Sequence, residues 1–358
     1  MHVHLLIFSL SFLVLPTTPF FMSSPAKRQK INGSSSLDLL EQHTVIVCDT
    51  GDVDAIKKNT PQDATTNPSL IYKAALLPAY SNLVTSSISY AKSKVSNPSS
   101  SPDTILPVVL DKLAVTFGAE ISKIVPGYVS TEVDARLSFD TAGTVAKARE
   151  LIAMYDEVGV SKSRILIKIA ATWEGVKACE VLEAEGITCN LTLIFSLAQA
   201  IACAEVGKAT LISPFVGRIM DWYKKKEGVS GYESKEDPGV KSVKNIYNYY
   251  KTFGYKTIVM GASFRNSGEI MELCGCDRLT IAPSLLEELR NGDGVEGGFG
   301  QKLDASKATF EGSKIEITEA KFRWMMNEDA MATEKLAEGI RGFSADLVKL
   351  ENVIREKL

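Results

Sequence analysis

Histidine is scarce in this chain of 358 residues. Only His2, His4 and His43 are present, and two of them lie in the first four residues. A Ser-His-Asp triad or a histidine-rich zinc site would have too few imidazoles to work with. Chemistry on a carbonyl group would therefore need a covalent amine rather than a metal, and we expect neither a metal nor a cofactor.

Cysteine pairs and excess charge of one sign are also missing. The six cysteines are scattered, mostly within apolar segments, and show no paired CxxC spacing, so they indicate reduced core thiols rather than zinc ligands or a disulfide scaffold. They are Cys48, Cys179, Cys189, Cys203, Cys274 and Cys276. A net charge of −3 gives no electrostatic reason to bind nucleic acid or an anionic membrane. Small solutes are the expected partners.

The amino-terminal residues differ from the rest of the chain. Residues 1–21 form an apolar leader, but its run Leu5 to Leu15 cannot span a bilayer of about 30 Å, no Lys or Arg precedes it, and no A-x-A cleavage site follows. Residues 22–36 form a basic, serine-rich arm. We expect a cytoplasmic protein that starts functionally at Met22. An organelle-targeting leader is the alternative, and the basic cluster in the arm leaves a minor nuclear pool open.

From residue 44 onward, short β-branched runs alternate with long helical periods. With 45% hydrophobic residues and no linker, residues 37–358 are expected to form a single domain. The expected strands are 44–48, 64–66, 129–133, 165–170, 188–194, 210–215, 257–262 and 279–283. Eight such strands close a (β/α)8 barrel, so the fold class is α/β.

The segments between these strands predict helices. They cover 69–95, 141–158, 173–185, 196–206, 239–253 and 283–290, with one or two more in 318–357. The stretch 291–314 is rich in glycine and polar residues and predicts a surface excursion.

Lys168 lies inside the apolar run ILIKIA, residues 165–170, which has the composition of a fully buried parallel strand. Burial in an apolar barrel disfavours an ammonium and releases the lone pair of the amine, which can then attack a carbonyl. The alternative is that the side chain reaches past the strand end into solvent.

Other polar residues gather where the expected strands end, which is where barrel enzymes carry their chemistry. They are Asp49, Asn67, Glu132, Asp134, Asn190, Thr192, Ser213 and Ser263. Taken singly, each has a structural explanation: Asn67 could cap a helix, Asp49 could form a turn, and Thr192 could be a satisfied strand hydroxyl. Together with Lys168, they supply the acid, base and hydroxyl-holding groups that imine chemistry needs.

Two arginines follow strand ends in glycine-bearing loops. They are Arg218, in SPFVGR, and Arg265, in GASFRN. A pair of guanidinium groups near a helix start suits a phosphate dianion. A surface ion pair is the alternative for either residue alone.

Long ordered strings of this sequence resemble the transaldolase family, from about Leu37 to Leu358. They are CDTGD (48–52), PQDATTNPSL (61–70), STEVDARLSFD (130–140), LIKIAATWEG (166–175), CNLTLIFSLAQA (189–200), LISPFVGRIMDWY (211–223), DPGVKSV (237–243), MGASFRN (260–266) and GCDRLTIAP (275–283). The resemblance implies a class I, Schiff-base (β/α)8 aldolase of the pentose phosphate pathway. Such an enzyme moves a dihydroxyacetone unit from sedoheptulose 7-phosphate to glyceraldehyde 3-phosphate.

The resemblance also implies roles for single residues. Lys168 matches the imine-forming lysine, Glu132 the carboxylate that relays protons through a water held with Thr192, and Asp49 the acid/base at the donor's C4 hydroxyl. The matched substrate-binding residues are Asn67, Asn190 and Ser213 for the dihydroxyacetone unit and Arg218 and Arg265 for the phosphate, and Phe215 is expected at the substrate site as well. The implied partners are phosphorylated sugars, and a homodimer is left open.

Two rival functions remain at this stage. A fructose 6-phosphate aldolase would release free dihydroxyacetone. Relatives of that kind carry Gln where this chain has Glu132 and Tyr where it has Phe215, so both positions favour transfer. A catalytically inactive barrel used as a binding protein could have lost Lys168, Glu132 or Asp49, and all three are present. The chain departs from the family pattern at Tyr128, Ala171 and Lys208-Ala209, which bears on substrate preference more than on reaction type.

Overall fold

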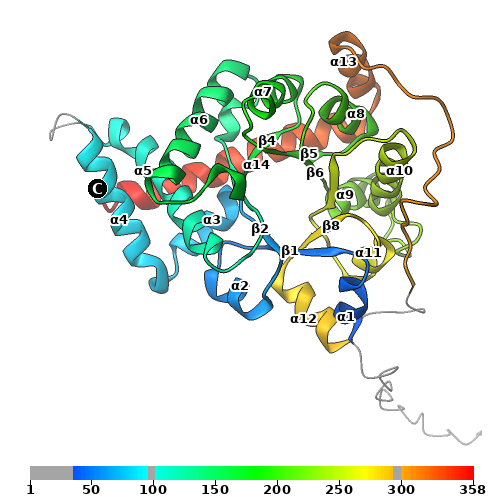
Figure 1. Ribbon diagram of the computed structural model, residues 1–358, viewed down its shortest axis with the longest axis horizontal. Coiled ribbons are helices and arrows are strands. Elements are labelled where there is room, and N and C mark those ends of the chain that lie inside the picture. The colour runs from blue at the N-terminus through cyan, green and yellow to red at the C-terminus, as the bar shows by residue number, and fades with distance from the viewer. Residues whose placement is uncertain (1–34, 96–100, 293–299) are drawn as a thin grey trace, which may run out of the picture. The chain divides into compact units, whose positions relative to one another are not determined.

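Eight parallel strands form a closed barrel, in which each strand pairs with the next along the chain and β8 pairs with β1 (Figure 1). The computed structural model describes residues 35–95, 101–292 and 300–358. The strands are β1 (Val45–Asp49), β2 (Asp63–Thr65), β3 (Val129–Glu132), β4 (Ile165–Ala170), β5 (Cys189–Ile194), β6 (Leu211–Pro214), β7 (Ile258–Gly261) and β8 (Arg278–Ile281). The leader and nearly all of the basic arm lie outside the described residues.

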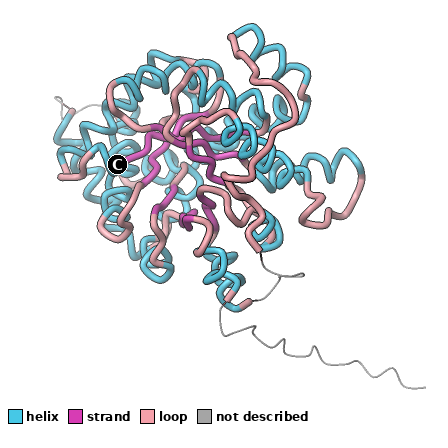
Figure 2. The backbone as a smooth tube through the Cα atoms, turned by 45° about the vertical axis from the view of Figure 1, so that its right-hand side comes forward, coloured by secondary structure: helices cyan, strands magenta, loops and turns pink. Residues whose placement is uncertain are grey.

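Helices surround the strands on all sides of the barrel (Figure 2). They are α1 (Ser36–Glu41), α2 (Val53–Asn59), α3 (Pro68–Ala75), η2 (Pro78–Tyr80), α4 (Ser81–Lys94), α5 (Pro102–Ser122), η3 (Ala135–Leu137), α6 (Thr141–Glu157), η4 (Lys162–Arg164), α7 (Trp173–Ala184), α8 (Leu197–Glu205), α9 (Val216–Glu227), α10 (Pro238–Thr252), α11 (Ser267–Glu272), α12 (Pro283–Asn291), α13 (Glu319–Glu328) and α14 (Ala330–Arg355). Several begin at a side-chain cap just after a strand. Asn67, Thr172 and Ser196 each accept a hydrogen bond from a backbone N–H in the first turn.

The predicted strands are confirmed, each to within two residues. The predicted helix over 69–95 is wrong, because the chain breaks after Ala75 and restarts at Pro78, whose ring cannot continue a helix. The sequence analysis also missed α1, α2, α5, α9 and α11. Helix α5 buries residues around most of its circumference, so it lacks the apolar stripe that marks an amphipathic helix. Helix α11 has only six residues, too few to show a period.

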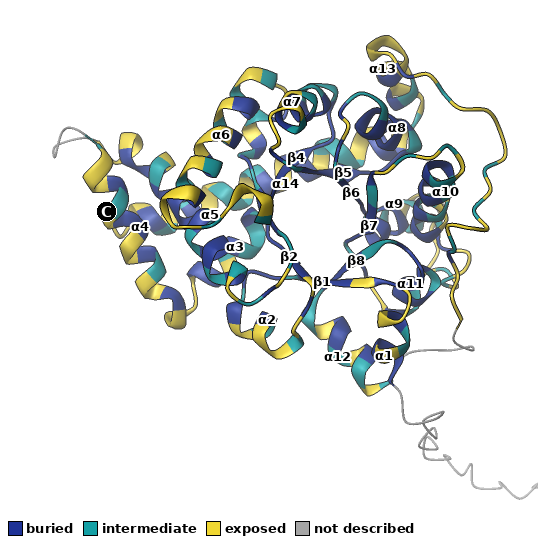
Figure 3. Cartoon of the chain, viewed as in Figure 1, coloured by how far each residue is buried: buried dark blue, intermediate teal, exposed yellow. Residues whose placement is uncertain are grey.

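Burial follows the layers of a barrel. The strands and the helix faces turned toward them are buried, while the outward faces are exposed (Figure 3). Inside the barrel, a small cluster of Val47, Leu166, Leu211 and Met260 fills the space between strands, with Tyr128 and Ile258 packed against it. All six cysteines are buried and free. Among the described residues, no helix is both long enough and apolar enough to cross a membrane.

Helix α14 packs on α3, α5, α9 and β5 and so joins helices from separate parts of the barrel wall (Figure 1). Polar contacts hold it in place. Ser69 on α3 donates a hydrogen bond to Asp346, and Arg136 in η3 pairs with Glu351 at 2.9 Å. The helix therefore closes over the end of the barrel where β5 finishes.

An ion pair between a buried aspartate and a largely enclosed arginine links the starts of two strands that flank β1. Arg278 Nη1 of β8 lies 3.1 Å from Asp63 Oδ2 of β2, and the Tyr128 backbone N–H donates to Asp63 Oδ1 at 2.6 Å. The centroid of the Tyr128 ring lies 5.4 Å from the Arg278 guanidinium carbon. Gly127 has to be glycine here, because a Cβ would lie 1.8 Å from Asp63 Oδ1. The departure from the family pattern at Tyr128 thus places an aromatic ring against Arg278.

We expect Asp63→Asn to lower the free energy of unfolding by roughly 3 kcal/mol or more, because it leaves the Arg278 guanidinium buried without its counter-charge. Urea unfolding followed by circular dichroism measures this. Asp54→Asn is the matched control, since Asp54 and its partner Lys57 are both exposed. Equal stability of the two variants would show that the Asp63–Arg278 pair contributes little.

Candidate active site

Three polar side chains stand in one row on neighbouring strands. Glu132 of β3 is the register partner of Lys168 on β4, and Lys168 is the partner of Asn190 on β5. Register partners in parallel strands point to the same face of a sheet. The strand pairing itself therefore brings an amine, a carboxyl group and an amide together.

Lys168 is buried, with 4% of its surface exposed. Its Nζ lies 3.1 Å from Glu132 Oε2 and donates to the Thr66 carbonyl at 3.4 Å. The Phe343 ring of α14 covers it, with the ring centroid 5.6 Å from Nζ. The alternative of a lysine that reaches solvent is therefore wrong.

Glu132 is almost fully enclosed, with 3% of its side chain exposed. Burial raises the pKa of Glu132, and the nearby Lys168 opposes that shift. Thr192 is the register partner of Ala170, two residues beyond Asn190 on β5. Its Oγ1 is buried and has no hydrogen-bond partner among the described residues, so it can bind a water or a substrate hydroxyl.

A chain of hydroxyl groups ends on Asp49 of β1. Thr65 Oγ1 donates to Asp49 Oδ1 at 2.9 Å and lies 2.7 Å from Thr280 Oγ1. Because the single Thr65 proton goes to Asp49, the Thr280 hydroxyl must be the donor to Thr65. Burial raises the pKa of Asp49, while Lys168 and the Thr65 hydrogen bond oppose the rise. Asp49 is thus held by a network and does not act as a simple turn former.

A second network fixes the amide of Asn190, which is fully buried. Its Nδ2 donates to Ser130 Oγ at 3.1 Å, and its Oδ1 accepts from Ser213 Oγ at 2.7 Å. Asn67 also has the structural function considered above, since its Oδ1 accepts the Leu70 N–H at 2.9 Å and caps α3. That function does not exclude a second one, because Asn67 lines the central cavity as well.

The two arginines lie in different surroundings. The Arg218 guanidinium carbon lies 5.0 Å from the Phe215 ring centroid and 5.6 Å from that of Phe343, and desolvation together with the charge of Arg265 lowers its pKa. Arg265 Nη2 pairs with Asp221 Oδ2 at 2.8 Å. The ion-pair alternative therefore holds for Arg265 in the absence of a ligand.

Gly217 permits the approach of the two arginine-bearing segments. A Cβ at this position would lie 2.5 Å from the Ser263 carbonyl oxygen and 2.6 Å from Arg265 Cγ. The Gly217 N–H donates to that carbonyl at 2.9 Å. Ser263, singled out as a strand-end residue, has a φ of 63° and accepts a hydrogen bond from Arg265. It shapes the loop that carries Arg265.

These groups surround a cavity of about 70 Å³ at the carboxyl end of the barrel. Its wall consists of Asp49, Thr65, Asn67, Lys168, Thr192, Ser213, Phe215, Arg218, Ala262, Ser263, Thr280 and Phe343. Most of the predicted site residues are therefore brought together. Glu132 contacts Lys168 and Asn190 contacts Ser213, but neither residue is itself part of the wall. Arg265 is not part of the wall either.

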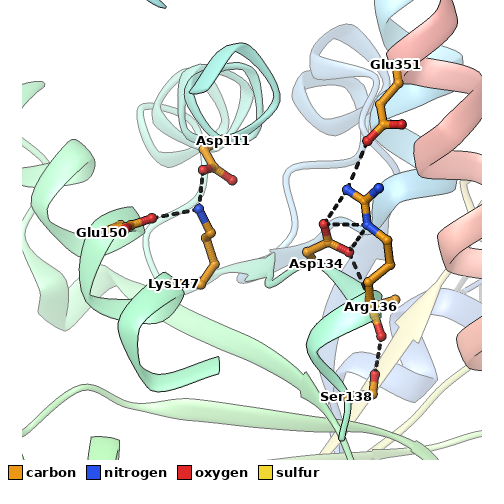
Figure 4. Close-up of polar contacts among 8 residues, drawn as sticks. Asp111, Asp134, Arg136, Ser138, Lys147, Glu150 and Glu351 are labelled. Atoms are coloured by element: carbon orange, nitrogen blue, oxygen red, sulfur yellow. Dashed lines mark hydrogen bonds and ion pairs between the residues drawn. The ribbon is translucent and has the colours of Figure 1, made fainter. Parts of the chain in front are cut away.

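A second cavity of about 260 Å³ adjoins the first, since Asn67 lines both and Glu132 lines the second. Two ion-pair clusters border it (Figure 4). Arg136 bridges Asp134 and Glu351, and the nearby Lys147 lies between Asp111 and Glu150. Asp134, noted above at the end of β3, therefore pairs with Arg136 rather than with the buried lysine.

Sequence reasoning missed Thr65, Thr280 and Phe343. The two threonines occur in short strands where a hydroxyl has many structural uses. Phe343 is an apolar residue at helical spacing in α14, a pattern that indicates core packing and carries no sign of a nearby cavity.

A cluster of Cys179, Glu183 and Cys189 has the composition of a metal site. The Glu183 oxygens already accept hydrogen bonds from the Cys189 and Thr210 backbone N–H groups and from the Thr210 hydroxyl. Burial also raises the pKa of Cys179 well above its ordinary value, which disfavours the thiolate that binds metals. This cluster secures α7 to β5 and β6.

A closed parallel barrel with a buried lysine–carboxyl pair at the carboxyl ends of its strands defines an enzyme of the aldolase class. Comparison with known proteins narrows this class. Residues 46–354 match the family model described as transaldolase/fructose-6-phosphate aldolase. The chain belongs to this family.

Individual relatives agree with the family match. A protein named transaldolase from Alteromonas mediterranea is 59% identical over 325 residues, which is 91% of this chain and 99% of its own length. Another of that name from Vibrio parahaemolyticus is 58% identical over 91% of this chain and 100% of its own length. One from Synechocystis sp. is 58% identical over 91% of this chain and 82% of its own length.

We expect Thr65→Val to raise the pKa of Asp49 further, because it removes a hydrogen bond to the charged form while keeping the shape of the side chain. Carbon-13 NMR titration of the aspartate carboxyl groups measures the change. Thr280→Val, which removes only the donor to Thr65, should shift the pKa of Asp49 in the same direction by less. A larger shift in Thr280→Val than in Thr65→Val would contradict this order of donors.

Proposed function

We propose that the protein is a transaldolase that transfers a dihydroxyacetone unit from sedoheptulose 7-phosphate to glyceraldehyde 3-phosphate. The products are erythrose 4-phosphate and fructose 6-phosphate, and the reaction also runs in reverse. The observation that carries the proposal is the Lys168–Glu132 pair, 3.1 Å apart and enclosed in the barrel of a chain that belongs to this family. Phosphorylated sugars of the pentose phosphate pathway are the substrates.

Imine formation is the first step of the proposed mechanism. The Lys168 amine attacks the C2 carbonyl of the donor sugar, and the resulting carbinolamine loses one water to give the imine. Glu132 starts protonated: it gives its proton to the carbonyl oxygen as the amine adds, takes a proton back from the nitrogen, and gives that proton to the departing hydroxyl. Water then leaves, and the imine remains protonated at nitrogen. The raised pKa of Glu132 suits it to carry that proton, and the Thr192 hydroxyl holds a water beside it.

Carbon bond cleavage is the second step. Asp49 accepts the proton of the donor's C4 hydroxyl while the C3–C4 bond breaks, and the electron pair of that bond moves through C3 and C2 to the protonated imine nitrogen. An aldose leaves and an enamine remains on Lys168. With the acceptor aldehyde the sequence reverses: C3 attacks the aldehyde carbon, and Asp49 returns its proton to the new hydroxyl. Because the imine serves as the electron sink, this sequence requires no metal or redox cofactor.

Other residues of the site hold the substrate. We assign the hydroxyl groups of the dihydroxyacetone unit to Asn67, Asn190 and Ser213, whose amide and hydroxyl groups form or contact the cavity wall. We assign the phosphate to Arg218 and Arg265. A dianion between them would relieve the mutual repulsion that, with desolvation, lowers the pKa of Arg218.

Transfer, rather than release of free dihydroxyacetone, requires that water stays away from the enamine. Phe343 covers Lys168 from α14, and Phe215 adds an apolar face beside Arg218. Glu132 and Phe215 stand where the fructose 6-phosphate aldolases carry Gln and Tyr, so both residues favour transfer. An inactive binding barrel is not favoured, because such a protein could have lost Lys168, Glu132 or Asp49, and the chain retains all three. We further propose that the enzyme acts in the cytoplasm.

Borohydride added with fructose 6-phosphate should trap a covalent adduct on Lys168, because reduction converts the imine to a stable secondary amine. Peptide mass spectrometry locates the adduct. Lys168→Ala should fold and lose both the adduct and nearly all turnover. The matched control is Lys112→Met, since Lys112 is the other buried lysine of the described chain and lies over the Tyr90 ring. Modification of any lysine other than Lys168 would refute the proposed chemistry.

Asp49→Ala should still form the imine but transfer the dihydroxyacetone unit roughly 10² to 10⁴ times more slowly, the usual contribution of a positioned acid/base. Trapping of the adduct and a coupled assay with fructose 6-phosphate and erythrose 4-phosphate separate the two steps. Transfer at a rate near that of the wild type would show that another group takes the C4 hydroxyl proton.

A further inference from the structure

Strand β5 departs from regular geometry directly after Thr192. Its pairing with β6 shifts between Leu191 and Ile194, where β5 has one residue more than its neighbour. Leu193 has a φ of 57°, in the left-handed region that a residue with a Cβ disfavours, and it is fully buried. A residue in this conformation persists only where the surrounding structure holds it there.

The side-chain amide of Gln199 binds the backbone around Leu193. Its Nε2 donates to the Leu193 carbonyl at 3.0 Å and to the Ala171 carbonyl at 2.9 Å. Its Oε1 accepts the Phe195 N–H at 2.9 Å. The reverse orientation of the amide would set its oxygen against two carbonyl oxygens, so this orientation is the one that the backbone allows. Gln199 is fully buried, and all three of these bonds are enclosed with it.

The same set of bonds fixes the backbone of Thr192. The Thr192 carbonyl accepts the Ala171 N–H at 2.8 Å, and the Ala171 carbonyl accepts from Gln199. Thr192 therefore lies between two peptide groups that the Gln199 amide holds. Its hydroxyl lines the same cavity as Lys168 and has no hydrogen-bond partner within the described part of the chain. The position of this hydroxyl thus depends on the backbone that carries it.

Helix capping is the simpler explanation for Gln199. Ser196 is the N-cap of α8 and accepts the Gln199 N–H at 3.2 Å, and in a capping box a Gln or Glu at this place binds the N–H of the cap residue in return. Here Gln199 binds the Phe195 N–H instead, one residue earlier, and donates to two carbonyls outside α8. A Glu would serve a cap equally well but has no N–H to donate. The two explanations can therefore be separated.

We propose that Gln199 is a positioning residue for imine formation: its amide holds Leu193 in the left-handed conformation and so fixes the Thr192 hydroxyl at the water that Glu132 uses. The inference rests on the proposed function, since it assigns that water to Thr192 and Glu132. Gln199 is not part of the cavity wall and acts through Thr192. Without its two donated bonds, Leu193 leaves the left-handed region and the Thr192 hydroxyl is displaced, whereas Lys168 keeps its place on β4.

The test follows one oxygen atom of the donor sugar. Imine formation releases the C2 oxygen as water, and hydrolysis of the imine restores it from solvent, so fructose 6-phosphate labelled with oxygen-18 at C2 loses its label through these two steps. Mass spectrometry measures the loss, and the rate without enzyme is subtracted. Gln199→Glu should lower the enzyme-catalysed rate roughly 10- to 100-fold, because displacement of a reacting group by about 1 Å can have an effect of that size.

A double-mutant cycle shows whether Gln199 acts through Thr192. Thr192→Val removes the hydroxyl and keeps the shape of the side chain. Once the hydroxyl is absent, adding Gln199→Glu should change the rate of label loss by less than about two-fold, the scatter expected for such cycles. Multiplication of the two single effects would refute the inference, because it is the result expected when the amide only stabilises the fold.

Two further variants complete the experiment. Gln199→Met has a side chain of similar length without a charge or an N–H, so it should lose label as slowly as Gln199→Glu, and it carries the test if the Glu variant does not fold. Gln301→Glu is the matched control, since Gln301 Nε2 donates to the Leu303 carbonyl at 2.8 Å, and it should match the wild type. Circular dichroism checks the fold of each variant. A wild-type rate in both Gln199 variants would overturn the inference.

Failure of the proposed function would give a different result. The wild type would then lose no label above the uncatalysed rate and form no borohydride adduct on Lys168. A wild type that does both, together with Gln199 variants that lose label equally fast, would exclude the role of Gln199 and leave the proposed function intact.

Discussion

The contact between Lys168 and Glu132 inside the closed barrel is the interaction on which the rest of the site depends. Two ionisable groups removed from water are costly, and their attraction offsets that cost only when the geometry is good. Here the geometry comes from strand register, which places the two residues directly opposite each other on β3 and β4. A slip of one residue in either strand would turn one side chain outward and leave the other unpaired.

Two hydrogen-bond networks around this pair fix the positions of Asp49 and Asn190. Thr280 and Thr65 fix one oxygen of Asp49, while Ser130 and Ser213 fix both ends of the Asn190 amide. Each network crosses between strands, so the position of a reactive group is set by the whole barrel end rather than by one loop. Such rigidity reduces the reorganisation that the groups must undergo when charge moves during reaction.

The sequence predicted the strands well because strands buried on both faces appear as short continuous apolar runs, and Lys168 stands out inside such a run. It also predicted that polar residues gather where the strands end, as in barrel enzymes, and most of them lie around one cavity. Two kinds of feature were not predictable. Helix α5 has no polar face to give it a period, and Phe343 reaches Lys168 only through the packing of α14, which no local pattern encodes. Asp134 is a different case: it was grouped with the site because it follows β3, but it pairs with Arg136, two residues further along the chain.

Helix α14 follows every strand of the barrel in the sequence, yet it supplies the ring that covers the Lys168 amine. During synthesis, all eight strands are therefore available to pair before this cover exists. For that interval the end of the barrel near Lys168 remains open, and the polar groups there can satisfy their hydrogen bonds with water. The order of the elements along the chain thus places the residue that covers the cavity after all the strands that form its wall.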